Sequence, residues 1–134
     1  MMKYKVKVFG LTSMVKGELL LYPFPLSFLG DVDPNTGRIA VKGFDRSLKG
    51  KILLIPEGKG SSVGAYVLFA LKKRGNSPLA VVTCKPDITI ASGCIVAEIP
   101  YAYGIPENEL DKLSSYKYAL LDPRRNEAVF SKTP

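Results

Sequence analysis

The residue types best suited to chemistry form one short run between a strongly apolar segment and a predicted helix: Gly58, Lys59, Gly60, Ser61 and Ser62. Glycines let a backbone come close to a ligand, and the free N–H groups at a helix N-terminus favour an anion. The two adjacent hydroxyls can donate or accept a hydrogen bond and, once deprotonated, act as a base. The spacing fits neither a Walker A loop nor a dinucleotide fingerprint. The run therefore predicts either an anion-binding catalytic loop or a plain helix cap in which the glycines make the turn.

The composition narrows the chemistry that this chain can do alone. It has no histidine, which removes the commonest general base and the commonest metal ligand. Its two cysteines, Cys84 and Cys94, cannot supply the three or four thiolates of a zinc or iron–sulfur site. Each cysteine lies in an apolar, strand-like setting, which predicts a reduced and buried thiol. We therefore expect no metal site in this chain and expect any cofactor to be held elsewhere.

Length and charge indicate a soluble protein of one domain. The 134 residues are 46% apolar and 23% charged, an ordinary balance for a globular chain. The net charge of +7 permits an anionic ligand, but the basic residues are dispersed, so no nucleic-acid tail is indicated. No apolar run approaches the roughly 18–20 residues that span a bilayer, and the N-terminus has no signal-peptide stretch. The predicted location is cytoplasmic.

The apolar pattern predicts a mixed α/β fold of layered sheets with one well-defined helix, at 63–71, that is buried on most sides. Ser61 or Ser62 is expected to cap this helix, and Gly75 to end it. A parallel strand–helix–strand crossover should join the strands at 51–56 and 79–84. A second, short helix is predicted at 108–115 with Asn108 as its cap, and loops are predicted at 27–38 and 43–50. The other expected strands are at 3–9, 15–22, 38–41, 94–99, 118–121 and 128–131, the last two as a hairpin.

Three stretches in this order resemble the swivelling domain of the aconitase X family: residues 30–39, residues 58–64, and residues 88–93 followed by an apolar strand. The resemblance covers nearly the whole chain and implies that residues 1–134 form a single swivelling domain of β/β/α type. Ordinary aconitases have an arginine after the two serines, which binds a substrate carboxylate. Val63 stands there in this sequence, so the resemblance implies a hydroxy acid other than a tricarboxylate.

The resemblance further implies the small subunit of a two-chain archaeal hydro-lyase of the mevalonate pathway to isoprenoids, inactive without its large subunit. The reaction would be the dehydration of (R)-5-phosphomevalonate to trans-anhydromevalonate 5-phosphate. The large subunit would hold a 4Fe-4S cluster, and this heterodimer would have no nucleic-acid or membrane partner. Two alternatives stay open: the small subunit of an aconitase X-type hydroxyproline dehydratase, and a non-catalytic basic module that binds nucleic acid or protein.

By the same resemblance, a serine of this chain removes the proton beside the substrate carboxylate. We place this base on Ser62, with Ser61 as the alternative, since either hydroxyl can be the cap and the other the reactive group. Gly58, Lys59 and Gly60 would bind substrate, with Lys59 pairing with its phosphate. Arg38 can clamp an anion, although a turn-forming role is favoured for it and for its neighbours Asp31 and Asp33. Tyr101 and Tyr103 are expected either at a subunit interface or packing a loop.

Overall fold

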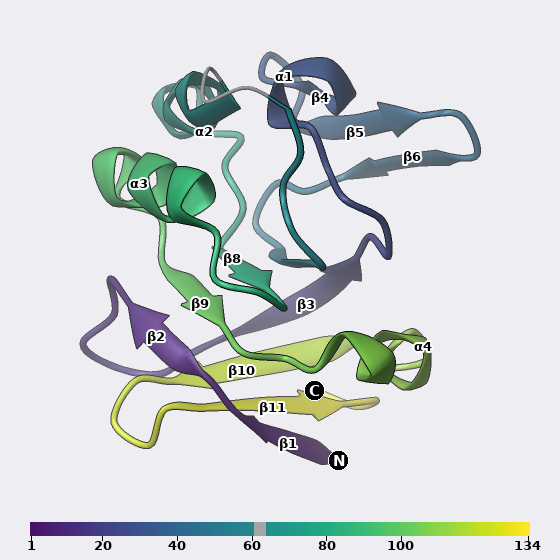
Figure 1. The fold of residues 1–134 in the computed structure, drawn as a ribbon, viewed down its shortest axis with the longest axis vertical. Coiled ribbons are helices and arrows are strands. Elements are labelled where there is room, and N and C mark those ends of the chain that lie inside the picture. Colours follow the sequence, from purple (N-terminus) through teal and green to yellow (C-terminus); the bar gives the residue numbers. More distant parts are fainter. Residues whose placement is uncertain (61–63) are drawn as a thin grey trace.

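The computed structural model describes residues 1–60 and 64–134. In this part of the chain, eight strands form one sheet and three form a smaller antiparallel sheet beside it (Figure 1). The large sheet has the order β1 (Met2–Lys5), β11 (Glu127–Ser131), β10 (Tyr118–Asp122), β3 (Val15–Leu21), β7 (Ile52–Ile55), β8 (Ala80–Thr83), β9 (Tyr101–Tyr103) and β2 (Lys7–Phe9). The small sheet contains β4 (Val32–Asp33), β5 (Arg38–Val41) and β6 (Phe44–Ser47).

The two edge strands of the large sheet, β1 and β2, are separated in the chain by Val6 alone. The sheet therefore curls so that its two edges come together at Val6, and side chains on its inner surface form one core. Val6 is 5% exposed and belongs to this core, together with the fully buried Phe130 of β11. The alternation of Tyr4, Val6 and Val8 with lysines predicted a half-exposed strand here, and burial alternates in that way along β1 and β2.

Helices cover the outer surface of the parallel part of the sheet. They are α2 (Gly64–Lys73) and α3 (Ile88–Ala97), with the short α1 (Phe28–Asp31), η1 (Glu107–Glu109) and α4 (Leu110–Leu113) elsewhere. β3, β7, β8 and β9 run parallel, with α2 between β7 and β8 and α3 between β8 and β9. The predicted crossover and the mixed α/β fold of layered sheets are confirmed. In such a unit, the segments that follow parallel strands meet at one edge of the sheet, where ligands commonly bind.

The strand predicted at 94–99 is wrong, because most of these residues belong to α3. Asp87 caps this helix by accepting a hydrogen bond from the Ile90 N–H, 3.0 Å away. Glu98, with φ +56°, ends it in the left-handed conformation. An apolar run of this length is compatible with a strand or with a buried helix, and periodicity alone cannot separate the two.

Three smaller differences concern local structure. α2 is buried along one side only, since Tyr66 is 74% exposed and Phe69 is 45% exposed. Among the described residues, α2 and α3 are both ten residues long, whereas one well-defined buried helix was expected. Asn108 lies inside η1 and is not a cap. The predicted loops at 27–38 and 43–50 contain α1, β4 and β6.

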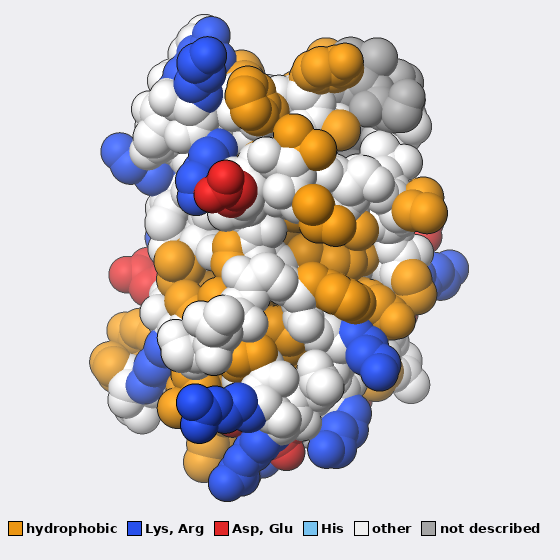
Figure 2. Space-filling model, turned by 90° about the vertical axis from the view of Figure 1, so that its left-hand side faces the viewer, with side chains coloured by type: hydrophobic (Ala, Val, Ile, Leu, Met, Phe, Trp, Pro, Cys, Tyr) orange, Lys and Arg blue, Asp and Glu red, His pale blue; other side chains and the backbone are white. Residues whose placement is uncertain are grey.

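Exposed apolar side chains gather on the outer helices, and Figure 2 shows hydrophobic side chains clustered on this side of the molecule. They come from both α2 and α3, which approach closely at Gly93. A Cβ atom at Gly93 would lie 2.9 Å from Leu68 Cδ1 and 3.1 Å from Ala65 Cα. We call this surface the α2–α3 face; its large exposed apolar side chains are those of Tyr66, Phe69, Ile88, Ile95 and Val96. The helices described here are all too short or too polar to cross a membrane.

Candidate active site

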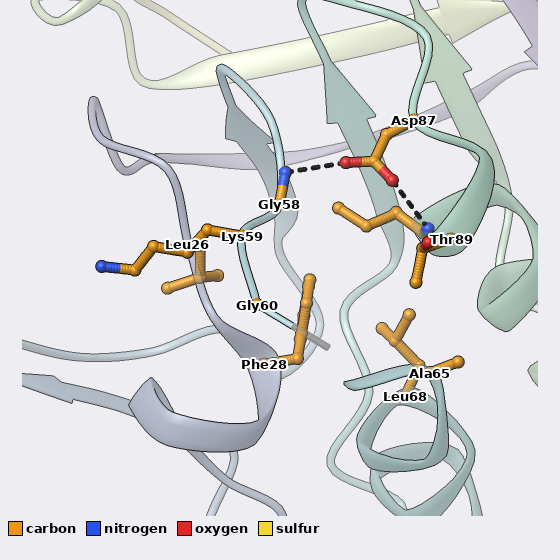
Figure 3. A pocket seen from close by; sticks show the side chains of 10 residues that line it. Leu26, Phe28, Gly58, Lys59, Gly60, Ala65, Leu68, Asp87 and Thr89 are labelled. Carbon is orange, nitrogen blue, oxygen red and sulfur yellow. Dashed lines mark hydrogen bonds between the residues drawn. The ribbon is translucent and has the colours of Figure 1, made fainter. Parts of the chain in front are cut away.

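A hollow of about 90 Å³ lies where α1, the segment after β7, and the first turns of α2 and α3 converge (Figure 3). It sits beyond the carboxyl ends of β7 and β8, the edge of the sheet at which parallel strands place their following segments. Its wall is part apolar and part exposed backbone, with two charged side chains. The lining residues are Leu26, Phe28, Gly58, Lys59, Gly60, Ala65, Leu68, Asp87, Thr89 and Ile90.

The segment that carries the glycines is held on one side by backbone hydrogen bonds to Leu26. The Leu26 N–H donates to the Glu57 carbonyl over 3.1 Å, and the Lys59 N–H donates to the Leu26 carbonyl over 3.0 Å. These bonds form an isolated parallel bridge between Leu26 and Gly58. The backbone of residues 57–59 is therefore fixed like a short strand, although it lies outside the sheets.

On its other side the same segment is held by Asp87. One carboxylate oxygen, Oδ2, accepts a hydrogen bond from the Gly58 N–H at 2.9 Å, and the other, Oδ1, accepts from the Ile90 N–H at 3.0 Å. Figure 3 shows the carboxylate between the two backbone nitrogens. Asp87 thus joins the end of the glycine segment to the start of α3.

Asp87 is itself supported from inside the fold by two buried hydroxyls. The Asp87 N–H donates to the Tyr101 hydroxyl at 3.0 Å, and that hydroxyl lies 2.6 Å from Thr83 Oγ1. Thr83 donates its one proton to the Lys85 carbonyl, so Tyr101 must be the donor to Thr83. Burial raises the pKa of the Tyr101 phenol, so the phenol keeps the proton that it donates to Thr83.

Both described glycines of the run are needed for close approach or for backbone conformation. A Cβ atom at Gly58 would lie 2.7 Å from Ile90 Cδ1 and 3.2 Å from Asp87 Oδ2. Gly60 has φ +95°, and a Cβ atom there would lie 3.4 Å from Ser27 Oγ. A side chain would therefore crowd the hollow at the first position and strain the backbone at the second.

The structure brings together some of the residues that the sequence selected. Gly58, Lys59 and Gly60 all line the hollow, although the Lys59 side chain is exposed and its amino group points away from Asp87 (Figure 3). Arg38 is not among the described residues that line it. Its Nε donates to Asp45 Oδ1 at 2.8 Å on the small sheet, a role in holding the β5–β6 hairpin.

The two predicted bases, Ser61 and Ser62, lie outside the described residues, as does their possible role as caps. The sequence places them between Gly60, which lines the hollow, and Gly64, where α2 begins. The turn-forming role favoured for Asp33 is confirmed, since its carboxylate accepts a hydrogen bond from the Asn35 N–H at 2.9 Å.

Asp87 is the residue that sequence reasoning missed. Its signal was an aspartate directly before an apolar run, the usual mark of a helix N-cap. The expectation of a strand at 94–99 concealed it. Tyr101 is 2% exposed and packs within the fold, which agrees with the loop-packing alternative for this residue.

The thiols are free and buried, as predicted. Cys84 belongs to the core inside the large sheet, and Cys94 to the core between the sheet and the helices. Burial raises the pKa of Cys84 to about 11 and that of Cys94 to about 12. Among residues 1–60 and 64–134, no three His, Cys, Asp or Glu side chains are grouped to hold a metal ion. The two buried thiols do not fit an iron–sulfur cluster, which needs three or four cysteine ligands.

The family follows from comparison with known proteins. The model of the aconitase X swivel domain matches residues 5–130. The chain belongs to the aconitase X swivel domain family. A crystal structure of Thermococcus kodakaraensis aconitase X in its holo form superposes with a TM-score of 0.81 at 34% identity, covering 96% of this chain and 97% of that chain. The swivel-domain fold is therefore shown by sequence and by structure.

Curated members of this family carry a more specific name. The phosphomevalonate dehydratase small subunit of Pyrococcus furiosus is 42% identical over 127 residues, 92% of each chain. The protein of the same name from Thermococcus onnurineus is 46% identical over 98 residues, 71% of this chain and 75% of the relative. The aconitase X swivel domain described here is thus similar to these small subunits along most of its length.

Proposed function

We propose that this chain is the small subunit of a phosphomevalonate dehydratase. The observation that carries the proposal is the similarity to curated small subunits of that name over 92% of both chains. The geometry supports it, because Gly60 and Ala65, described residues on either side of the two serines in the sequence, both line the hollow. The chain has no histidine and its two cysteines are buried. It therefore offers neither histidine nor an exposed thiol as a metal ligand, which suits an active site completed by a second chain.

The reaction removes water from a 3-hydroxy acid. The carbon next to the carboxylate loses a proton, its electron pair forms the new double bond, and the hydroxyl on the following carbon leaves. The proton and the hydroxyl together account for the released water. This chain's part is to take the proton and to hold the substrate in a fixed orientation while the hydroxyl departs.

Ser62 is the proposed base, with Ser61 as the alternative. A free serine hydroxyl has a pKa too high for this task, so its alkoxide needs stabilisation by nearby donors. α2 begins at Gly64, and the unpaired N–H groups at a helix N-terminus stabilise negative charge. The proposal thus assigns the helix a chemical role in addition to its packing.

Lys59 is the proposed partner of the substrate phosphate. Lys59 is exposed and lines the hollow, and the described ion pairs of the chain do not include it. The net charge of +7 favours approach of an anionic substrate. Arg38, engaged with Asp45, is the weaker candidate for this role.

The large subunit is proposed to hold the 4Fe-4S cluster, which would supply Lewis-acid chemistry to the site when bound. It must cover the hollow to bring that chemistry to the substrate. The α2–α3 face shares Ala65 with the hollow and continues from it along both helices. α3 carries no charged residue between Ile88 and Ala97, yet Ile95 and Val96 are 69% and 68% exposed. An apolar surface of this kind indicates an interface, and we assign it to the large subunit.

The test is anaerobic co-expression with the cognate large subunit, followed by purification and an assay with two substrates. The proposal predicts a stable complex that dehydrates 5-phosphomevalonate and leaves hydroxyproline unchanged. A complex that acts on hydroxyproline instead would overturn the substrate and keep the reaction class. Failure of the two chains to associate would overturn the assignment as a subunit.

A further inference from the structure

We propose that Asp87 is a positioning residue, which fixes the backbone of Gly58 and with it the glycine segment that lines the hollow of the active site. The inference rests on the proposed function, because it deepens the role of that same site. Its basis is that the two oxygens of this carboxylate accept hydrogen bonds from two different segments. Oδ1 accepts the Ile90 N–H of α3, and Oδ2 accepts the Gly58 N–H at 2.9 Å.

A helix cap alone needs only one of these oxygens. Serine, threonine and asparagine cap helices about as well as aspartate, and each would satisfy the N–H of Ile90. A carboxylate is the short side chain that accepts at both ends at once, since an asparagine amide turns one end into a donor. The helix cap alone would not require aspartate at position 87. The bond to the Gly58 N–H does, because it needs a second acceptor oxygen.

The Asp87 backbone is held as firmly as its side chain. Its N–H donates to Tyr101, whose hydroxyl bonds to Thr83. Tyr101 is 2% exposed and Thr83 is fully buried, so this support belongs to the sheet itself. Hydrogen bonds thus connect Thr83 of β8 and Tyr101 of β9 to Gly58 through Asp87. Backbone bonds to Leu26 hold the same segment from the opposite side.

A side chain at Gly58 would be crowded by Ile90 and by the Asp87 carboxylate. A Cβ atom at Gly58 would meet Ile90 Cδ1 at 2.7 Å and Asp87 Oδ2 at 3.2 Å. The glycine and the aspartate are therefore complementary parts of one arrangement. Displacement of reacting groups by about 1 Å can lower the rate of an enzyme on the order of 100-fold, so we expect loss of this bond to lower turnover.

The variant that tests the inference is Asp87→Asn, which keeps the α3 cap and places a donor against the Gly58 N–H. Its matched control is Asp122→Asn. Asp122 also accepts two backbone N–H bonds, from Arg124 and Arg125, in the β10–β11 turn. Three readouts are compared in both variants and the parent: the hydrogen exchange of the Gly58 and Ala91 amides in the full chain, the melting temperature, and kcat and KM of the complex.

In Asp87→Asn we expect Gly58 exchange to accelerate about tenfold and kcat to fall roughly 10- to 100-fold with KM nearly unchanged. The Ala91 amide, which donates to the Asp87 carbonyl at 2.8 Å, should stay protected, and Asp122→Asn should match the parent complex. If the parent complex is active and the Asp87→Asn complex has the same kcat, the inference is overturned. Loss of Ala91 protection together with a lower melting temperature would also overturn it, because it would show a merely structural role. An inactive parent complex would instead overturn the proposed function.

Discussion

The Asp87 carboxylate and the Gly58 backbone N–H are 29 positions apart in the chain and 2.9 Å apart in space. The bond joins the segment that follows β7 to the segment that follows β8, two parallel neighbours in the sheet. Because β7 and β8 lie side by side in the sheet, the segments that follow them come close enough for this bond to form at the candidate active site.

Replacement of Ser62 by alanine is predicted to lower kcat of the complex by about 100- to 10,000-fold, the usual contribution of a general base. Ser61→Ala is the matched control and should retain most of the parent activity. Steady-state rates are measured on complexes that co-purify in the same ratio as the parent. A reversed order of the two variants would move the base to Ser61.

Gly60→Ala is predicted to lower the free energy of unfolding by about 1–3 kcal/mol, because a side chain is strained at φ +95°. Gly43→Ala is the matched control, since Gly43 has φ +85° with open space around it, in the β5–β6 turn. Urea unfolding should show similar losses in both variants, whereas activity should fall in Gly60→Ala alone. Equal activity in the two variants would contradict a catalytic role for the segment.

Val96→Glu is predicted to weaken assembly with the large subunit by at least about tenfold, because it places a charge in the centre of an apolar interface. The isolated chain should keep its stability, since Val96 is 68% exposed. Met14→Glu, at a position 62% exposed in the β2–β3 connection, is the control and should bind as the parent does. The dissociation constants are measured by calorimetry. Unchanged binding by Val96→Glu would remove the α2–α3 face from the interface.

Stability is predicted to fall at alkaline pH through the buried thiols. In the folded chain Cys94 has a pKa of about 12, against an ordinary value of 9.0. Between about pH 9 and 12 the unfolded state therefore loses the proton first, and the free energy of unfolding falls as pH rises. By pH 10.5 the loss should be on the order of 1–2 kcal/mol. Urea unfolding under reducing conditions measures it, and Cys94→Ala should show a shallower decline; an identical decline would exclude Cys94 as its source.

Local signals in the sequence predicted much of this fold. Gly75 ends α2 with φ +73°, as predicted. The last two strands pair as the predicted hairpin. Each of these features depends on a few consecutive residues, which is why the sequence could reveal it.

The remaining features depend on contacts between distant residues. The second half of α3 was predicted as a strand because its apolar side chains are not confined to one face of the helix. Cys94 and Ala97 are buried, whereas Ile95 and Val96 are exposed. The small sheet is assembled from short pieces such as β4, which pairs through Val32 and Asp33 alone. The glycine segment was identified from its residue types, but its ties to Leu26 and Asp87 arise only from the tertiary fold.

The most direct test of the central claim is a proton NMR assay of 5-phosphomevalonate with the anaerobically purified two-chain complex. We expect a vinyl proton signal to grow as water is lost, and to require both chains. The same signal from the large subunit alone would contradict the proposed function, as would a stable complex that produces no vinyl proton from this substrate.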